Sequence, residues 1–480
     1  MLDSKNEISL TKALTPICVL ISLLAYNIIV YEDKDWFGEN TYQIILLLGA
    51  SLASIMGLID RVTILHILKK IFLSIKSIAI PIVILLLVGA LAGTWKVSGV
   101  IPAMVYYGLN LIDPTVFLPL TLIVTAVVSL TTGSSYTTSA TVGIALVAVG
   151  TAFNISPGMT AGAVISGAYF GDKMSPLSDT TNLAPAMAGG DLYTHIKYMT
   201  FTTVPTFIFT FLVFCLISLN IDTSAIGDMS SILTLSDTIS NDFYISPILF
   251  LVPVLVIILA FLKVRPVIAL SCGVVLAIVF TLIFQQNILN LIDPSDYNAV
   301  FNSVFLDTEI PTDNDRIVRL YNSGGMKGML WTINLTICAM IFGGSMDAIG
   351  ALSKITSALL ERAKNIFGLF VSTVISCLGI NIAASDQYLA IVIPGKMFKE
   401  AYEERGLAPE NLSRTLEDSG TVTSALIPWN TCGAYHYGVL GVSAPEYFIY
   451  AIFNWLSPIM TLIYAGFFIK IRTILNTKTL

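Results

Sequence analysis

The sequence contains several apolar runs that are long enough to cross a lipid bilayer, and this feature constrains the fold more than any other. Examples are TPICVLISLLAYNIIVY (15–31), SIAIPIVILLLVGALAGTW (77–95) and VFLPLTLIVTAVVSL (116–130). About 20 apolar residues in a helix span the hydrocarbon core. The chain has 480 residues, of which 55% are hydrophobic and only 12% are charged, whereas soluble domains carry about 25% charged residues. We therefore predict an all-α polytopic membrane protein.

The distribution of basic residues predicts the orientation of the chain, because Lys and Arg are retained on the cytoplasmic side. Basic residues cluster at 61–76, 263–265, 396–414 and 470–478. By contrast, the segment 220–244 has four aspartates, the segment 286–315 has six acidic residues, and neither contains Lys or Arg. We expect these two loops to be external and both termini to be cytoplasmic, which requires an even number of transmembrane segments, about 10–14. The expected location is the cell (plasma) membrane.

The spacing of cysteine and histidine argues against a disulfide framework, a metal cluster and an enzyme. The six cysteines stand singly, without a CxxC pair, and most lie in apolar runs. The three histidines are too far apart in the sequence to suggest a zinc site. HExxH, GxSxG and P-loop motifs are absent, so neither hydrolysis nor ATP-driven pumping is supported. The start MLDSKNEISLTK leads into the first span without a small-residue cleavage site, so we expect no cleaved signal peptide.

Two regions, about 131–195 and 377–443, are apolar enough for the membrane yet are interrupted by Gly, Pro, Ser, Thr and acidic residues. Interrupted segments in corresponding places of two halves point to the binding site of a transporter. An offset of 246 positions places Asp172 on Asp418 and Ser178 on Ser424, which favours an internal repeat over coincidental composition. We divide the chain into N-terminal spans with a basic loop (1–76), a first repeat (77–220), connecting spans with an acidic loop (221–325) and a second repeat (326–480).

The motif GDKMSPLSDTTNLAP (171–185) gathers charge in an apolar region. Ser is a preferred helix cap and Pro is tolerated at the first helical position, so Ser175-Pro176 predicts a helix start after a break at 171–174. Backbone carbonyls, carboxylates and hydroxyls in such a break are ligands for a small cation, and a buried carboxylate also takes up a proton. We interpret Asp172 and Asp179 as parts of a transport site and Lys173 as a structural counter-charge.

The second interrupted region supplies a matching set of polar residues. NIAASDQYLAIVIPG (381–395) places Asp386 between two apolar runs, with Pro394-Gly395 expected to close the piece. In LEDSGTVTSALIPWNTCGAY (416–435), Asp418 is either an ion ligand or, with Glu417, the cytoplasmic cap of the following segment. The charged stretch 399–417 is interpreted as a solvated cytoplasmic connector.

A third polar run, SLTTGSSYTTSATVG (129–143), carries nine Ser and Thr residues around Gly133 and no charge. Two interpretations remain equally open. The run is either a small-residue face for close helix packing, or a hydroxyl-lined break in which Ser134 and Ser135 contact the ion or substrate.

The motifs GDKMSPLSDTTNLAP, TTGSSYTTSATVG, SDQYLAIVIPGKMF and EDSGTVTSALIPWNTCGA resemble those of the NhaC sodium/proton antiporter family, in the ion transporter superfamily, and the resemblance runs across nearly the whole chain. It implies two inverted-topology repeats, each with a helical hairpin and a broken helix, and antiport of protons against sodium. The implied ion-site residues are Asp172, Ser175, Ser178, Asp179 and Asn182 in the first half and Ser385, Asp386, Asp418, Ser424 and Asn430 in the second. The segment AYHYG departs from the family, because we expect small or apolar residues where His436 and Tyr437 stand.

We predict a secondary transporter that extrudes Na+ in exchange for H+, with Na+ held at Asp172, Asp179 and Asp386 and no cofactor beyond the transported ions. The alternative of the same family is a Na+/H+-coupled exchanger of a dicarboxylate for a monocarboxylate, such as malate for lactate. A channel or a membrane enzyme is the alternative of a different class. The expected partners are Na+, H+ and the lipid bilayer, with small organic acids and a homo-oligomer left open and nucleic acid excluded.

Overall fold

The computed structural model describes residues 8–31, 40–220, 229–312 and 321–474, and within these ranges the regular structure is helical, with two isolated β-bridges and no strand. The first half contains α1 (Leu10–Tyr31), α2 (Thr41–Ile59), α3 (Ile64–Ser77), α4 (Ala79–Val97), α5 (Val100–Leu111), α6 (Phe117–Thr132), α7 (Ser135–Thr138), α8 (Ile144–Ala152), α9 (Pro157–Met174), α10 (Asp179–Ala188) and α11 (Leu192–Leu219). The rest contains α12 (Met229–Asp242), α13 (Leu251–Phe261), α14 (Pro266–Phe284), α15 (Gln286–Ile292), α16 (Asp296–Phe305), α18 (Leu330–Ala348), α19 (Ala351–Arg362), α20 (Ile366–Ala383), α21 (Gln387–Glu404), α22 (Pro409–Leu416), α23 (Thr431–Leu440), α24 (Ala444–Tyr447) and α25 (Ile452–Gly466).

Nine helical segments in the described part of the chain are long and apolar enough to cross a membrane. A tenth span is obtained if the pair Thr234–Asp242 and Pro247–Phe261, whose axes differ by 82°, is counted as one broken span. Shorter apolar helices, Val100–Leu111 and Ile452–Gly466, add to the bundle. The prediction of an all-α polytopic membrane protein is confirmed, and the evenness of the number of crossings stays a prediction.

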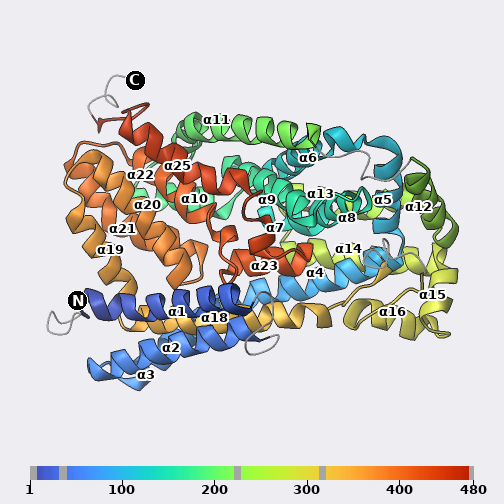
Figure 1. Ribbon diagram of the computed structural model, residues 1–480, viewed down its shortest axis with the longest axis horizontal. Coiled ribbons are helices and arrows are strands. Elements are labelled where there is room, and N and C mark those ends of the chain that lie inside the picture. Colours follow the sequence, from blue (N-terminus) through green and yellow to red (C-terminus); the bar gives the residue numbers. More distant parts are fainter. Residues whose placement is uncertain (1–7, 32–39, 221–228, 313–320, 475–480) are drawn as a thin grey trace.

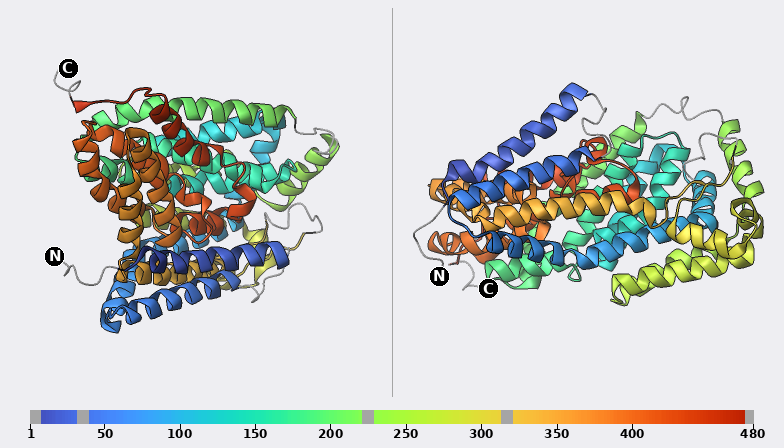
Figure 2. Two further views of the ribbon diagram at one scale, coloured as in Figure 1. Left: turned by 60° about the vertical axis from the view of Figure 1, so that its left-hand side comes forward. Right: turned by 90° about the horizontal axis from the view of Figure 1, so that it is seen from below.

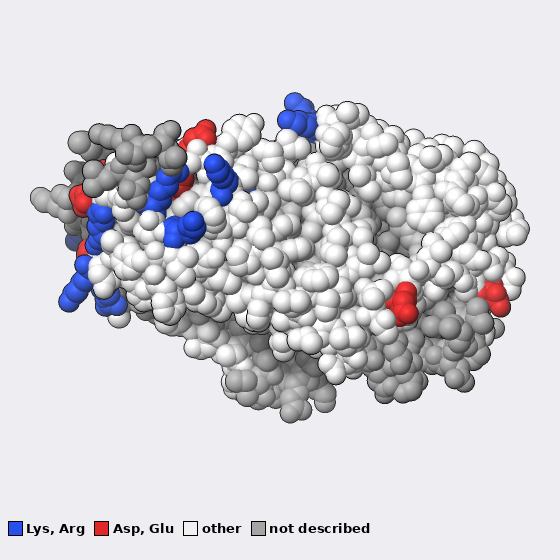
Figure 3. All heavy atoms as spheres, turned by 90° about the horizontal axis from the view of Figure 1, so that it is seen from above, with Lys and Arg blue, Asp and Glu red and all other residues white. Residues whose placement is uncertain are grey.

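The long helices run along the long axis of the molecule, so its two ends are distinct (Figure 1). The start of α1, the end of α25 and the helices α19 to α22 lie at one end, whereas α12, α15 and α16 lie at the other. Viewed from above, Lys and Arg gather at the first end, and the surface between the two ends is nearly free of charge (Figure 3). This is the charge pattern expected of a bundle whose middle faces lipid.

Helices α1, α2, α3 and α18 form a layer along one side of the body (Figure 2). The body is built around α6 and α9, which pack together more extensively than any other pair. Small residues permit this approach: a Cβ atom added to Gly171 would lie 2.6 Å from the Cβ of Ser129, and the Ser129 hydroxyl donates to the carbonyl of Ala168 at 2.5 Å. Membrane helices use such small residues because lipid offers no hydrophobic drive for helix association.

Four helical segments are interrupted inside the bundle. The breaks lie between α6 and α7, between α9 and α10, between α20 and α21, and between the π-turn Glu417–Thr421 that follows α22 and the start of α23. Such irregular backbone at membrane depth is tolerated where it is buried in protein or lines a cavity. The two interrupted regions predicted from the sequence are therefore observed as broken helices, while their relation as inverted repeats stays a prediction.

The first predicted break is displaced along the chain. Helix α9 continues through Gly171–Met174, which we expected to be extended, and the break follows at 175–178. Proline disfavours helical geometry in the residue before it, so Ser175 is extended, with φ −86° and ψ 128°. The new helix begins at Asp179 instead of Pro176 because the chain first makes a turn, in which the amide of Ser178 donates to the carbonyl of Ser175 at 3.2 Å.

Two further expectations for the second half are wrong. Pro394 does not close its segment, because it lies inside α21, which runs on to Glu404. The interpretation of 399–417 as a solvated connector is wrong for α22, in which every residue from Glu410 to Leu416 is buried, although Glu400, Glu403 and Glu404 before it are exposed. Some of the polar side chains of α22 are bound by neighbouring segments: Asn411, for example, receives a hydrogen bond from the Tyr198 hydroxyl at 2.7 Å.

Candidate functional site

A cavity of about 730 Å³, which we call the central cavity, lies where the broken helices meet. It is bounded by the N-terminal ends of four segments: α7, α10, α21 and α23. From these ends and from α9 come Ser134, Ser135, Tyr136, Asp172, Ser178, Asp179, Thr180, Asp386, Gln387, Tyr388, Thr431 and Tyr435. Because the N-terminus of a helix carries partial positive charge, four such ends stabilise ionised carboxylates in an otherwise apolar setting.

The break before α7 and the break before α21 have the same backbone design. Gly133 ends α6 with φ +68°, and Ser134 follows in an extended conformation and caps α7 by accepting from the amide of Thr137 at 3.2 Å. Ser385 has φ +59°, and Asp386 follows, also extended, and caps α21 by accepting from the amide of Leu389 at 2.9 Å. A non-glycine residue with positive φ is uncommon and strained, so Ser385 marks a backbone shape that the site requires.

The spacing of these breaks revises the offset expected between the two halves. Ser134 and Asp386, the caps of α7 and α21, are 252 positions apart, and so are Ser178 and Asn430, which precede α10 and α23. The offset of 246 expected from the sequence pairs Asp172 with Asp418, whereas a spacing of 252 does not. A cap is defined by backbone geometry and is filled by Ser, Asp or Asn alike, so residue identity alone does not fix the spacing, and the internal repeat itself stays a prediction.

Asp172 lies in the last turn of α9 and faces the cavity. One of its carboxylate oxygens accepts two hydrogen bonds from Ser135, from the backbone amide at 3.0 Å and from the hydroxyl at 2.7 Å. The break after Asp172 is held together by Thr181, whose hydroxyl donates to the carbonyl of Lys173 at 3.0 Å. One residue of the hydroxyl run around Gly133 therefore binds a carboxylate of the cavity, and contact of Ser134 or Ser135 with an ion stays a prediction.

Asp179 and Asp386 line the same cavity from two different helix starts. Asp179 is the first residue of α10 and is exposed, whereas Asp386 is buried and uses one oxygen to cap α21. Among the residues that the structure describes, no three His, Cys, Asp or Glu side chains are close enough to hold one metal ion. The three aspartates thus share a cavity without forming a single cluster, and a bound cation would take its other ligands from hydroxyls and backbone carbonyls.

The remaining residues of the predicted site lie outside the cavity lining. Ser175 and Ser424 are buried in turns, the Ser424 hydroxyl donating to the carbonyl of Thr421 at 2.5 Å. Asn182 donates to the carbonyl of Ser178 at 2.7 Å and so braces the break before α10. Asn430 caps α23 through the amide of Cys432 at 3.0 Å. These side chains shape the breaks that carry the cavity residues, and whether an ion ever reaches them stays a prediction.

Lys173 and Asp418 form an ion pair in which neither side chain is exposed to any extent. Asp418 also accepts hydrogen bonds from the hydroxyls of Thr202, at 3.0 Å, and Thr461. The Lys173 ammonium lies 5.6 Å from the ring centre of Phe453. Lys173 is therefore placed as a buried counter-charge, the role that the sequence suggested, and its partner is Asp418 from the other half of the chain.

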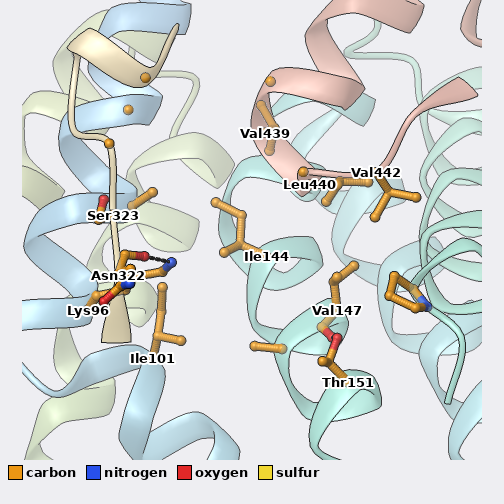
Figure 4. Close-up of a pocket in the computed structure, with 18 of the residues that line it drawn as sticks. Lys96, Ile101, Ile144, Val147, Thr151, Asn322, Ser323, Val439, Leu440 and Val442 are labelled. Carbon is orange, nitrogen blue, oxygen red and sulfur yellow. Dashed lines mark hydrogen bonds between the residues drawn. The ribbon is translucent and has the colours of Figure 1, made fainter. Parts of the chain in front are cut away.

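A second cavity, of about 350 Å³, is lined by 438–442 at the C-terminal end of α23 and by residues of other segments (Figure 4). It is mostly apolar, and Lys96 enters it from α4 and donates to the backbone carbonyl of Asn322. The rings of Tyr136 and Tyr435 line the central cavity and stack at 3.8 Å with an interplanar angle of 7°. The Tyr435 hydroxyl donates to the carbonyl of Tyr136 at 3.0 Å. Sequence reasoning missed the contact between Tyr136 and Tyr435 because nothing in either motif indicates a contact across 299 positions.

Known proteins with similar sequences identify the family of this chain. Residues 167–468 match the Na+/H+ antiporter family. The Na+/H+ antiporter NhaC of Alkalihalophilus pseudofirmus is 39% identical over 80% of this chain and 81% of that protein. The chain belongs to the Na+/H+ antiporter family.

Relatives with other names are also similar to this chain. The malate-2H+/Na+-lactate antiporter of Bacillus subtilis is 34% identical over 78% of each chain. The arginine/ornithine antiporter ArcD of Halobacterium salinarum is 31% identical over 96% of this chain and 92% of that protein. Membership of the family, which the motifs predicted, is confirmed, and the cargo must be argued from the cavity itself.

Proposed function

We propose that this protein is a secondary transporter, and not an enzyme, that exchanges Na+ for H+ across the cell membrane. The observation that carries the proposal is the charge of the cavity. Its lining includes four aspartates, Asp172, Asp179, Asp347 and Asp386, and one lysine, Lys70, whose ammonium is 2.8 Å from the Asp347 carboxylate. Three carboxylates are thus left facing the cavity without a basic partner from its lining, which favours a cationic cargo.

The same carboxylates account for exchange. A carboxylate accepts either a proton or a hard cation such as Na+, and each excludes the other. If the bundle turns the cavity from one side of the membrane to the other only when an ion is bound, Na+ leaves on one face while protons load there. Driven by an inward proton gradient, this cycle extrudes Na+. Asp386 is our first choice for the residue shared by the two ions, because it is buried and has a second oxygen that the cap does not use.

The basic end of the molecule, with the start of α1 and the end of α25, is proposed to be cytoplasmic. Lys70, Ser74 and Ser77 of α3 line the central cavity, so the cavity extends toward the helix that carries part of the predicted cytoplasmic basic cluster. We therefore propose that the structure represents the cytoplasm-facing state.

The exchange of organic acids is the second candidate. The volume of the cavity exceeds the needs of a bare ion, and the helix N-termini around it are suited to a substrate carboxylate. The relative that exchanges malate and lactate makes this a concrete alternative. We rank it second, because a dicarboxylate would lie against Asp172, Asp179 and Asp386 with no unpaired cation from the lining to meet it.

Reconstitution into proteoliposomes with an imposed pH gradient tests the proposal. Na+ alone should dissipate the gradient, and Asp386→Asn and Asp172→Asn should abolish the response. Asp113→Asn is the matched control, because Asp113 is an exposed helix cap that accepts from the amide of Thr115 at 2.9 Å, and Asn caps as well as Asp. If nothing moves until malate or lactate is supplied, the cargo is the acid and the proposal is wrong.

A further inference from the structure

Glu417 is a buried carboxylate that the exchange just proposed does not use. It begins the π-turn Glu417–Thr421 directly after α22, and no part of it is exposed. One carboxylate oxygen accepts a hydrogen bond from the Thr180 hydroxyl at 3.0 Å. The other accepts none from the described residues. A half-satisfied carboxylate in the interior is costly, and acids kept inside a membrane protein mark ion or proton pathways.

A chain of hydroxyl groups joins Glu417 to the central cavity. The Thr180 hydroxyl, which donates to Glu417, lies 3.1 Å from the hydroxyl of Ser178. Both Ser178 and Thr180 line the cavity, whereas Glu417 does not. A hydroxyl both donates and accepts hydrogen bonds, so these two hydroxyls form a continuous hydrogen-bonded chain from the cavity lining to the buried carboxylate.

The groups around Glu417 and Asp418 explain why Glu417, and not Asp418, is free to change its charge. Asp418 is bound by Lys173 and by two threonine hydroxyls. Lys173 and Asp172, both on α9, also act electrostatically on Glu417, but the ion pair of Lys173 is with Asp418.

The two other buried basic groups nearby are turned elsewhere. Arg414, on α22, lies 4.5 Å from the ring centre of Tyr198, and its guanidinium has no hydrogen-bond partner among the described residues. His195, on α11, is bound at Nδ1 to the Ser413 hydroxyl at 2.8 Å. Neither therefore binds the Glu417 carboxylate.

We propose that Glu417 is a second proton-carrying carboxylate of the exchanger, loaded from the central cavity through Ser178 and Thr180. This inference rests on the proposed Na+/H+ exchange. An excess proton from cavity water binds Ser178 as the Ser178 hydroxyl proton passes to Thr180 and the Thr180 hydroxyl proton passes to Glu417. Each hydroxyl ends with one proton, and the carboxylate becomes a carboxylic acid. Unloading reverses the order, so no oxidant, reductant or further reactant is needed.

The test counts protons released when Na+ binds to the purified, full-length protein. Calorimetric Na+ titrations in buffers of different ionisation enthalpy give that number, and the wild type must release protons for the exchange itself to stand. Glu417→Gln should release about one proton fewer per Na+. Glu410→Gln is the control and should match the wild type, because Glu410 lies on α22, directly before the turn of Glu417, but pairs with Arg472 at 3.3 Å, outside the relay.

A second pair of variants keeps the inference testable if Glu417→Gln does not fold. Thr180→Val removes the relay hydroxyl and should slow Na+-driven proton flux by about 10²-fold, the low end of what a positioned proton-transfer group contributes. Thr180→Ser restores the hydroxyl and should restore the flux. Infrared difference spectra should show a carboxylic acid that Na+ removes in the wild type and that is missing in Glu417→Gln.

Each failure has its own signature. If the wild type releases no proton on binding Na+, the proposed exchange is wrong. If the wild type does release protons but Glu417→Gln releases the same number, or Thr180→Val transports as fast as Thr180→Ser, the role assigned to Glu417 is wrong.

Discussion

Removing Lys173 should destabilise the protein by an amount that depends strongly on pH. The Lys173–Asp418 pair is fully buried, and removing one partner of such a pair costs about 3–5 kcal/mol because a charge is left uncompensated. In Lys173→Met, Asp418 avoids this state by taking up a proton. For an ordinary carboxyl pKa of about 3.9, that uptake costs about 4 kcal/mol at pH 7 and about 1.5 kcal/mol at pH 5.

The sign follows from proton linkage. In Lys173→Met the folded state binds a proton at Asp418 that the unfolded chain does not bind at pH 7, so stability rises as the pH falls. The stability of Asp418→Leu should instead fall as the pH falls. Here the stranded lysine must lose a proton, which costs about 5 kcal/mol at pH 7 and more at pH 5. The stranded lysine keeps only the ring of Phe453, whereas a stranded Asp418 keeps two hydroxyl donors.

The assay is reversible unfolding in mixed micelles at pH 7 and pH 5. The double variant Lys173→Met/Asp418→Leu should recover to within about 2 kcal/mol of the wild type, because apolar replacement of a buried pair is close to neutral. Lys327→Met is the control: Lys327 and Asp307 also form an ion pair, but both are more than half exposed, and such pairs contribute about 0–1 kcal/mol. A penalty for Lys173→Met that is equal at both pH values, or a double variant as unstable as the two single losses combined, would refute the reasoning.

Three further predictions test the site and the orientation. Gly133→Ala should destabilise by about 1–2 kcal/mol through its positive φ and further through a contact of 2.6 Å with Leu177, whereas Ser385→Gly should be neutral or mildly stabilising in the same unfolding assay. Thr151 lines the second cavity and Ser77 lines the central cavity. In a cysteine-free background, a membrane-impermeant maleimide should label Thr151→Cys from outside the cell and Ser77→Cys only in inside-out vesicles. The reverse labelling pattern would show that the proposed orientation is inverted. Tyr435→Ala should lose the ring stack with Tyr136, worth about 0.5–1.5 kcal/mol, in the same unfolding assay; a variant as stable as the wild type would show that the stack contributes nothing.

The sequence predicted the overall fold well because lipid permits few structures. Apolar runs of the right length must become helices, and the Gly, Pro and polar interruptions had to be buried breaks, since exposed backbone is not tolerated in lipid. The exact break was harder to place. Pro176 signals the end of a helix as readily as a start, and α10 begins three residues later because a turn intervenes.

The polar contacts between the halves could not be predicted, because they join residues far apart in the chain. Charge alone made 399–417 resemble a solvated connector, yet in the fold α22 packs against α10, α11 and α21, and its polar groups find partners there. The pairing of Lys173 with Asp418 spans 245 positions, so no local pattern indicates it. The apolar runs on both sides of Asp386, by contrast, favoured Asp386 over Asp418, and Asp386 is the one of the two that lines the cavity.

The adjacent acids Glu417 and Asp418 show most clearly why the polar contacts could not be predicted, because in the sequence they form one feature. Consecutive helical residues are rotated by roughly 100° about the axis, so neighbours in sequence face different helices. Here that rotation directs Asp418 to Lys173, Thr202 and Thr461, where its charge is compensated in place. It directs Glu417 to Thr180, whose hydroxyl leads to the cavity. One acid is thereby suited to hold the two halves of the chain together and the other to gain and lose a proton, a division that arises only from the packing of α9, α10, α11 and α25 around a single turn.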